Sequence, residues 1–209
     1  MTRFAAKPVR FGRRPADQGD EVDGLPTPTR IKLQARRAAG IAEAQAITEY
    51  LPAPGESVHC LFTARMDLTD LIGAILNKMG HCSSMRIATL GYGQRNLRKL
   101  IGFLDAGSVA SLGLVASLFF RAHEKELWTH TLSELRARKQ RAACCGCHAK
   151  VVTMHFATGE KLTIESSANL RASGSQIEQL TLFRDDALYD WHARWIEALI
   201  EKHEGRSDE

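Results

Sequence analysis

The sequence predicts an α/β fold, a mixed β-sheet flanked by helices on both faces, and three observations predict it. From residue 57, short apolar runs alternate with longer runs of helical periodicity. Three strand-like runs then follow one another without a helix between them. A last amphipathic segment has apolar residues at helical spacing, and 44% of all residues are hydrophobic, as a globular core requires.

The first 52 residues are expected to form a basic arm in front of a domain at residues 53–209. Residues 1–29 are rich in Arg, Pro, Gly and Asp and are predicted to be mostly disordered, and a helix is expected at about 30–50. Residues 1–37 hold nine Lys or Arg and four Asp or Glu, whereas the net charge of the whole chain is only +4. Such an arm suits contact with a phosphate backbone, and a solvated tail without a partner fits the same pattern.

The domain itself is predicted element by element from the period of its apolar residues and from its turn residues. The expected order is strand 57–64, helix 68–80, strand 85–92, helix 96–107, a strand within 109–120, helix 125–139, strands 147–156, 161–168 and 177–184, and helix 186–203.

Five cysteines are present, and three of them crowd into the stretch Cys144-Cys145-Gly146-Cys147-His148. Zinc is one interpretation, but structural zinc sites prefer cysteine pairs spaced C-x2–4-C with a second pair elsewhere. Adjacent cysteines on an extended chain point to opposite sides, which favours packing over metal binding. No metal and no other cofactor is therefore predicted.

The setting predicted for the chain is cytoplasmic and away from the membrane. The odd cysteine count argues against a disulfide framework. No run approaches the roughly 18 apolar residues of a transmembrane helix, and the N-terminal segment lacks an apolar leader.

One group of polar residues has the composition of a catalytic site. In the strand expected at 147–156, His148 and Lys150 would project from one face because residues i and i+2 share a face. The next strand ends in Ser166-Ser167-Ala168-Asn169, and Glu178 follows a short loop. An imidazole can attack phosphorus, a carboxylate on its other nitrogen sets its tautomer, and Lys and Asn donate to phosphate oxygens without a metal.

At these residues the chain resembles the phospholipase D superfamily, whose motif reads H-x-K-x4-D followed by G/S-S-x-N. The matching residues are His148-Ala-Lys150, Ser166-Ser-Ala-Asn169 and the downstream Glu178. The resemblance is greatest to short members with a single motif, of the bacterial endonuclease type and from phage genomes. It covers about three quarters of the chain, residues 57–203, as one half-unit of that fold.

The resemblance implies a metal-independent phosphodiesterase in which His148 forms a phosphohistidine and Glu178 orients it. Lys150 and Asn169 would hold the phosphate, with the Ser167 hydroxyl. Family enzymes build one active site from two motifs, so a single motif implies a homodimer with the site on its two-fold axis. The basic arm, the lack of a membrane-binding segment and the likeness to short nucleases favour nucleic acid as the substrate.

Two features keep other interpretations open. Where the family motif has Asp, this chain has His155, five residues after Lys150 and therefore on the opposite face of a regular strand. With the short loop before Glu178, this favours the alternative of a phospholipase D-like module that binds nucleic acid without cutting it. Cleavage of a small phosphodiester is a third interpretation.

Two further groups of charged residues have a simpler interpretation as surface residues without a catalytic role. His123-Glu124-Lys125 has the H-x-K spacing, but it opens a helical run without a Ser–Asn partner and is predicted to be exposed. A basic group near the site fits either an extended phosphate surface or a solvated helix face; its members are Arg86, Arg95, Arg98 and Lys99.

Overall fold

The computed structural model describes residues 27–63, 66–171 and 176–204. The disorder predicted for residues 1–29 therefore lies outside the described residues, except for the last three, which are helical. In chain order the elements are α1 (Thr27–Thr48), β1 (Ser57–Thr63), α2 (Leu68–Met79), β2 (Cys82–Thr89), α3 (Gln94–Asp105), β3 (Leu112–Ser117), α4 (Leu118–His123), α5 (Lys125–Ala137), β4 (Arg141–Cys145), β5 (Val151–Phe156), β6 (Lys161–Ser166), β7 (Ile177–Phe183) and α6 (Asp186–His203).

The strands form one mixed sheet in the order β1-β7-β6-β5-β2-β3-β4. β2, β3 and β4 run parallel, as expected for strands connected by crossover helices, and the other neighbours are antiparallel. Gly159, at a φ of 89°, lies in the turn that joins β5 to β6.

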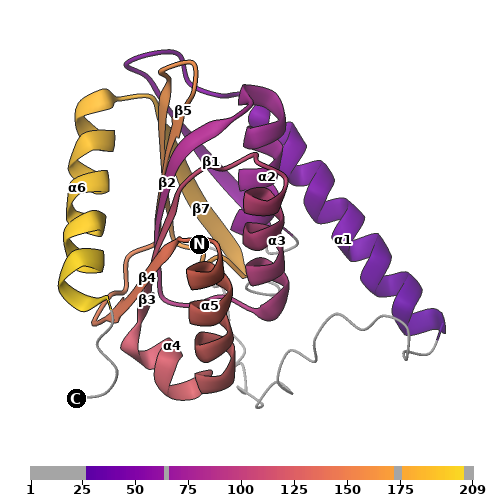
Figure 1. The fold of residues 1–209 in the computed structure, drawn as a ribbon. Helices are drawn as coiled ribbons and strands as arrows, with labels where there is room; N and C mark the ends of the chain where they lie inside the picture. The colour runs from indigo at the N-terminus through magenta and orange to yellow at the C-terminus, as the bar shows by residue number, and fades with distance from the viewer. Residues whose placement is uncertain (1–26, 64–65, 172–175, 205–209) are drawn as a thin grey trace, which may run out of the picture.

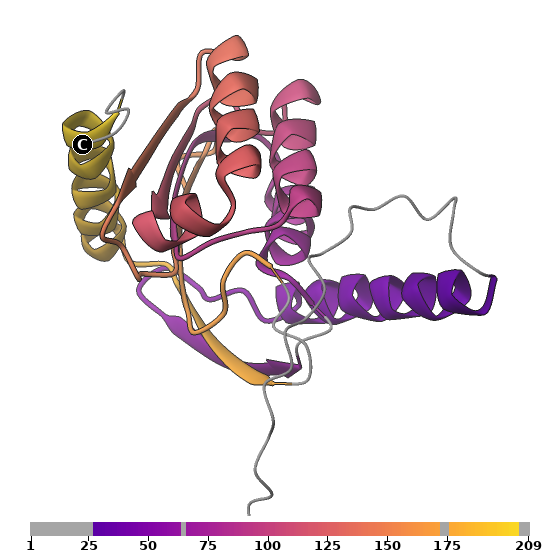
Figure 2. The ribbon, with the colours of Figure 1, turned by 90° about the horizontal axis from the view of Figure 1, so that it is seen from below.

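Helices cover both faces of the sheet, which confirms the predicted fold class (Figure 1). α2, α3 and α5 lie on one face, over the larger core, and α6 lies on the other (Figure 1, Figure 2). Beneath α6, a second apolar cluster includes Val115, Ile196 and Ile200. α1 packs on α2 and extends away from the sheet (Figure 2). No helix within the described ranges combines the length and apolar character that crossing a bilayer requires.

Three of the basic residues predicted near the site instead form ion pairs within the domain. Lys99 and Arg95 of α3 pair with Asp67 and Asp70, which cap α2 through a reciprocal capping box. Arg86 of β2 pairs with Glu197 of α6. The interpretation of these residues as a solvated helix face was therefore also incomplete, because their charged groups connect neighbouring helices and strands.

Some predicted boundaries are wrong, each for a local reason. The strand expected within 109–120 ends at Ser117, whose Oγ accepts a hydrogen bond from the Phe120 amide and caps the short helix α4. β4 was not predicted because it is short and lacks β-branched residues; it forms by pairing with β3. β5 begins at Val151, four residues later than expected, and β2 begins at Cys82, three residues earlier.

Candidate active site

All five predicted site residues come to one edge of the sheet. The parallel strands β2, β3 and β4 end there, and β5 begins there, with Val151 opposite Ala88. β6 ends and β7 begins at the same edge, where Ser166 pairs with Leu180. The carboxyl ends of parallel strands are the usual location of ligand sites in open α/β sheets.

His148 and Lys150 do not lie in a strand, so the prediction that they share a strand face is wrong. They belong to the segment between β4 and β5, where a Cys147 amide bonded 2.7 Å from the Cys145 carbonyl marks a tight turn. The two side chains nevertheless meet, because Lys150 Nζ lies 3.0 Å from His148 Nδ1 and 2.8 Å from the His148 carbonyl oxygen. His148 is exposed and Lys150 is partly buried.

The electrostatic surroundings of Lys150 matter for its charge. Partial burial lowers the pKa of Lys150, and the nearby Cys147 and Glu178 act in the opposite direction. An ammonium group with little water around it interacts more strongly with an anion than one on the open surface does.

The segment Ser166–Asn169 after β6, called here the Ser–Asn corner, connects Lys150 to β7 through hydrogen bonds. The Ser166 amide donates to the Lys150 carbonyl oxygen at 3.0 Å, and Ser166 Oγ donates to the Gln179 carbonyl oxygen at 2.9 Å. Ser167 Oγ accepts from the Gln179 amide at 3.0 Å and donates to the Glu178 carboxylate. His148 and Lys150 thus form one hydrogen-bonded pair, and Ser167 and Glu178 form another. The two pairs are related through the Ser166 amide, which bonds the Lys150 carbonyl oxygen, and through the charge of Glu178, which acts on Lys150.

Asn169 lies at the end of the same corner and is partly buried. The following residue is anchored by Asn96, whose Nδ2 donates to the Leu170 carbonyl oxygen at 3.1 Å. The Asn169 Oδ1 atom is buried and has no hydrogen-bond partner among the described residues. Because a buried polar atom without a partner is costly, this amide is suited to a polar ligand or a further protein group.

The two other histidines singled out by the sequence lie elsewhere. His155 faces α6, with its ring centroid 6.1 Å from that of Tyr189. His123, Glu124 and Lys125 are exposed at the junction of α4 and α5, as predicted.

The three clustered cysteines pack into two different regions. Cys144 belongs to the larger core, whereas Cys145 and Cys147 belong to the cluster beneath α6. Burial raises the pKa of Cys144 to about 11 and also raises that of Cys145, which disfavours the thiolate form that zinc binds. Across the described ranges, no three His, Cys, Asp or Glu side chains gather as metal ligands would.

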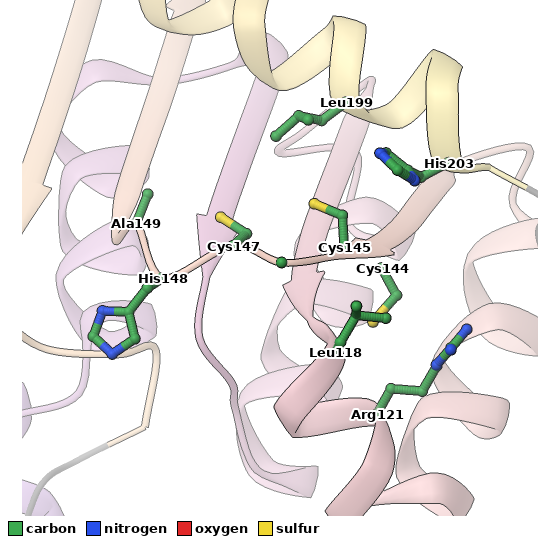
Figure 3. Close-up of a pocket in the computed structure, with 10 residues that line it drawn as sticks. Leu118, Arg121, Cys144, Cys145, Cys147, His148, Ala149, Leu199 and His203 are labelled. Carbon is green, nitrogen blue, oxygen red and sulfur yellow. The ribbon is translucent and has the colours of Figure 1, made fainter. Parts of the chain in front are cut away.

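A cavity of about 930 Å³ adjoins the site and was not anticipated (Figure 3). Its lining includes His148 and Ala149, residues of β4 and the loop after it, and residues of α4 and α6. Neither α4 nor β4 was expected, so no sequence signal placed Arg121 at the same cavity as His148.

Comparison with known proteins shows similarity in structure only. No protein-family model and no curated protein matches the chain. Polyphosphate kinase from Porphyromonas gingivalis has a TM-score of 0.54 at 12% identity, over 79% of this chain and 30% of the kinase, so this chain spans under a third of it. Nuc, a phospholipase D family member from Salmonella typhimurium, has a TM-score of 0.52 at 10% identity, over 73% of this chain and 100% of Nuc.

A third similar structure is TrmBL2, an archaeal chromatin protein. Its TM-score is 0.50 at 10% identity, over 85% of this chain and 65% of TrmBL2. At such low identities these similarities concern the fold and not the activity. The chain therefore has a phospholipase D-like fold, as one half-unit of the kind its motif predicted.

Proposed function

We propose that the chain is a metal-independent phosphodiesterase that cleaves nucleic acid through a phosphohistidine at His148, at a site shared by two copies. The observation that carries the proposal is the linked set of His148, Lys150, Ser167 and Glu178 at the carboxyl edge of the sheet. A nucleophile in contact with a cation, and a carboxylate near enough to act on that cation electrostatically, are what phosphoryl transfer without a metal needs.

The proposed reaction has two steps. His148 Nε2 attacks phosphorus, a nitrogen–phosphorus bond forms, and the bond to the leaving oxygen breaks. The leaving oxygen takes a proton from His148 of the partner subunit. Water then attacks the phosphohistidine, gives a proton back to that histidine, and releases the phosphate monoester while His148 is restored.

The tautomer of His148 sets a requirement on Lys150. While Lys150 Nζ donates to Nδ1, the neutral ring carries its proton on Nε2 and cannot attack from that atom. Attack requires the proton on Nδ1 and a carboxylate to accept from it, the role proposed for Glu178. Lys150 then moves to the phosphate oxygens, where it stabilises the charge that develops, with Asn169 Nδ2 as a further donor and with Ser167 as another once its hydroxyl turns from Glu178.

Two exposed apolar side chains support the proposed homodimer. Leu61 of β1 and Ile177 of β7 are both 77% exposed, on the strand pair that also carries Glu178. Gln179 pairs with Leu61, and Ile177 lies two residues before it on the same face, opposite to the face of Glu178. Large exposed apolar residues on these two strands, next to an incomplete site, are suited to contact with a second copy.

Nucleic acid is the proposed substrate for reasons of charge and of similarity. The sequence of α1 includes Arg30, Lys32, Arg36 and Arg37, and TrmBL2 is described as binding DNA in a novel mode. The second candidate is a module that binds without cutting. His155 at the position of the motif aspartate favours it, together with the likeness to TrmBL2.

Cleavage in EDTA separates the two candidates. The purified protein is incubated with single-stranded DNA, plasmid and bis(p-nitrophenyl) phosphate, beside His148→Asn and the control His130→Asn, an exposed histidine of α5. We expect the wild type and the control to cleave and His148→Asn to lose at least about 10³-fold in rate. Binding of DNA without cleavage by the wild type would establish the binding module instead.

A further inference from the structure

We propose that the cavity beside His148, together with the exposed Phe119 of α4, binds one nucleoside of a single-stranded nucleic acid next to the scissile phosphate. This subsite rests on the proposed function and adds to it the recognition of a base.

The cavity has the size and surface of a site for a flat apolar group. Its volume of about 930 Å³ falls within the roughly 300–1,000 Å³ typical of small-ligand sites. Leu199 of α6 lies on one side and Leu118 of α4 on the other, and the side chains of Cys145 and Cys147 point toward α6 (Figure 3). Buried cysteine side chains behave as small apolar groups.

Charge at the cavity favours an anionic ligand. Arg121 of α4 and His203 of α6 belong to the lining, and none of its ten described residues has a carboxylate side chain. A guanidinium group donates to phosphate in a bidentate manner and also stacks on bases. A nucleotide, with an apolar ring attached to a phosphate, combines the two properties that this lining offers.

The position of the cavity sets which nucleotide it would hold. His148 and Ala149 are part of its wall, and the His148 ring points away from the other lining side chains, so the cavity adjoins the loop that carries the predicted nucleophile (Figure 3). A phosphodiester attacked by His148 has a nucleoside on each side, and the one directed toward β4 and α4 enters the cavity. Its next phosphate then lies on the side of Arg121.

An exposed aromatic ring on α4, the helix that supplies Leu118 and Arg121 to the lining, favours a base over a lipid chain. Phe119 does not itself line the cavity; it is 61% exposed, and one side of its ring packs on His123, with ring centroids 4.1 Å apart. Exposed aromatic rings beside basic residues are the usual platform on which single-stranded bases stack. Stacking tolerates any base, so we expect little sequence preference at this subsite.

Binding and thiol protection test the subsite independently of cleavage. Fluorescein-labelled DNA and RNA decamers of one sequence are titrated by anisotropy against the wild type, Phe119→Ala and Arg121→Gln. The controls are Trp191→Ala, an exposed aromatic of α6, and Arg136→Gln, an exposed arginine of α5. We expect each subsite variant to raise Kd about tenfold, since a stacked base contributes about 1–3 kcal/mol, and each control to change Kd less than twofold.

In parallel, N-ethylmaleimide alkylation of the wild type is followed by mass spectrometry. Saturating decamer should slow alkylation of Cys145 and Cys147 at least fivefold and leave that of Cys60 in β1 unchanged. The subsite would be overturned if the decamer does not bind, or if the subsite variants behave like their controls. It would also be overturned if the decamer leaves the two thiols unprotected, or if dihexanoylphosphatidylglycerol protects them instead. Cleavage of bis(p-nitrophenyl) phosphate reports the proposed chemistry separately, so either proposal can fail while the other holds.

Discussion

Lys150 is the residue whose chemistry is best defined by its neighbours. It donates to His148, lies against the corner that carries Ser167, and interacts with the charge of Glu178. Its ammonium group must be charged to hold phosphate, and its pKa is lowered by burial. Activity should therefore depend on pH through this lysine.

The pH profile of kcat/KM is the first prediction. Loss of the Lys150 proton removes the phosphate donor, so the basic limb should fall below the value of about 10.4 of an ordinary lysine. Glu178→Gln removes a charge that raises the pKa of Lys150, so its residual activity should decline at still lower pH.

The measurement uses bis(p-nitrophenyl) phosphate from pH 6 to about 11, with Glu126→Gln, exposed on α5, as the matched carboxylate control. A basic limb for Glu178→Gln at or above that of the wild type would contradict the assigned electrostatics.

Single residues of the site were more predictable than their surroundings. The spacing of His148, Lys150, Ser167, Asn169 and Glu178 needed only a match of residue types along the chain. The contact between His148 and Lys150 instead depends on the tight turn at Gly146, which strand periodicity does not encode. Cavity residues such as Arg121 were beyond prediction because two unexpected elements, α4 and β4, place them.

At the scale of elements, α6 packs closely on the sheet. His192 Nε2 donates to Glu165 of β6 at 2.7 Å, and its Nδ1 accepts from Trp195 Nε1 at 3.0 Å. At Gly113 of β3, an added Cβ would lie 2.6 Å from both Arg86 Cδ and Ile200 Cδ1. A side chain at this position of β3 would therefore require Arg86 of β2 and Ile200 of α6 to shift.

The second prediction follows from this packing. Gly113→Val should lower the free energy of unfolding by about 1–3 kcal/mol, because Ile200 and the Arg86 stem must move. Gly102→Ala in α3 is the control of opposite sign; no heavy atom lies within 4 Å of its added Cβ, so it should stabilise by about 0.5–1 kcal/mol. Urea unfolding measures both, and a neutral Gly113→Val would contradict the close contact.

Elements with strong periodicity were predicted well, and α6 matches its expected range of 186–203. Elements that depend on tertiary contacts were not. β4 exists through its pairing with β3, and α4 exists through the Ser117 cap, so neither has a periodic pattern of its own.

For the whole molecule, the account requires two chains. One chain has a single H-x-K and S-S-x-N pattern, and Leu61 and Ile177 expose apolar surface on the strands next to it. The partner would supply the histidine that protonates the leaving oxygen. Oligomeric state and activity should therefore change together.

The third prediction is that Leu61→Glu with Ile177→Glu separates the chains. The double variant should be a monomer in sedimentation at about 10 µM and lose at least about 100-fold in cleavage, the range for loss of a general acid. Ser57→Glu, exposed on the same face at the other end of β1, should remain dimeric and active. A wild type that is active as a monomer would rule out the shared site.

Trapping of the covalent intermediate tests the central claim most directly. Protein mixed in EDTA with a decamer carrying ³²P at one internal phosphodiester is quenched in alkali within milliseconds, because phosphoramidate bonds of histidine survive alkali. The account predicts label on the peptide that contains His148, none in His148→Asn, and full labelling in the control His130→Asn. Rapid cleavage with no labelled peptide, or with label on another residue, would contradict nucleophilic attack by His148.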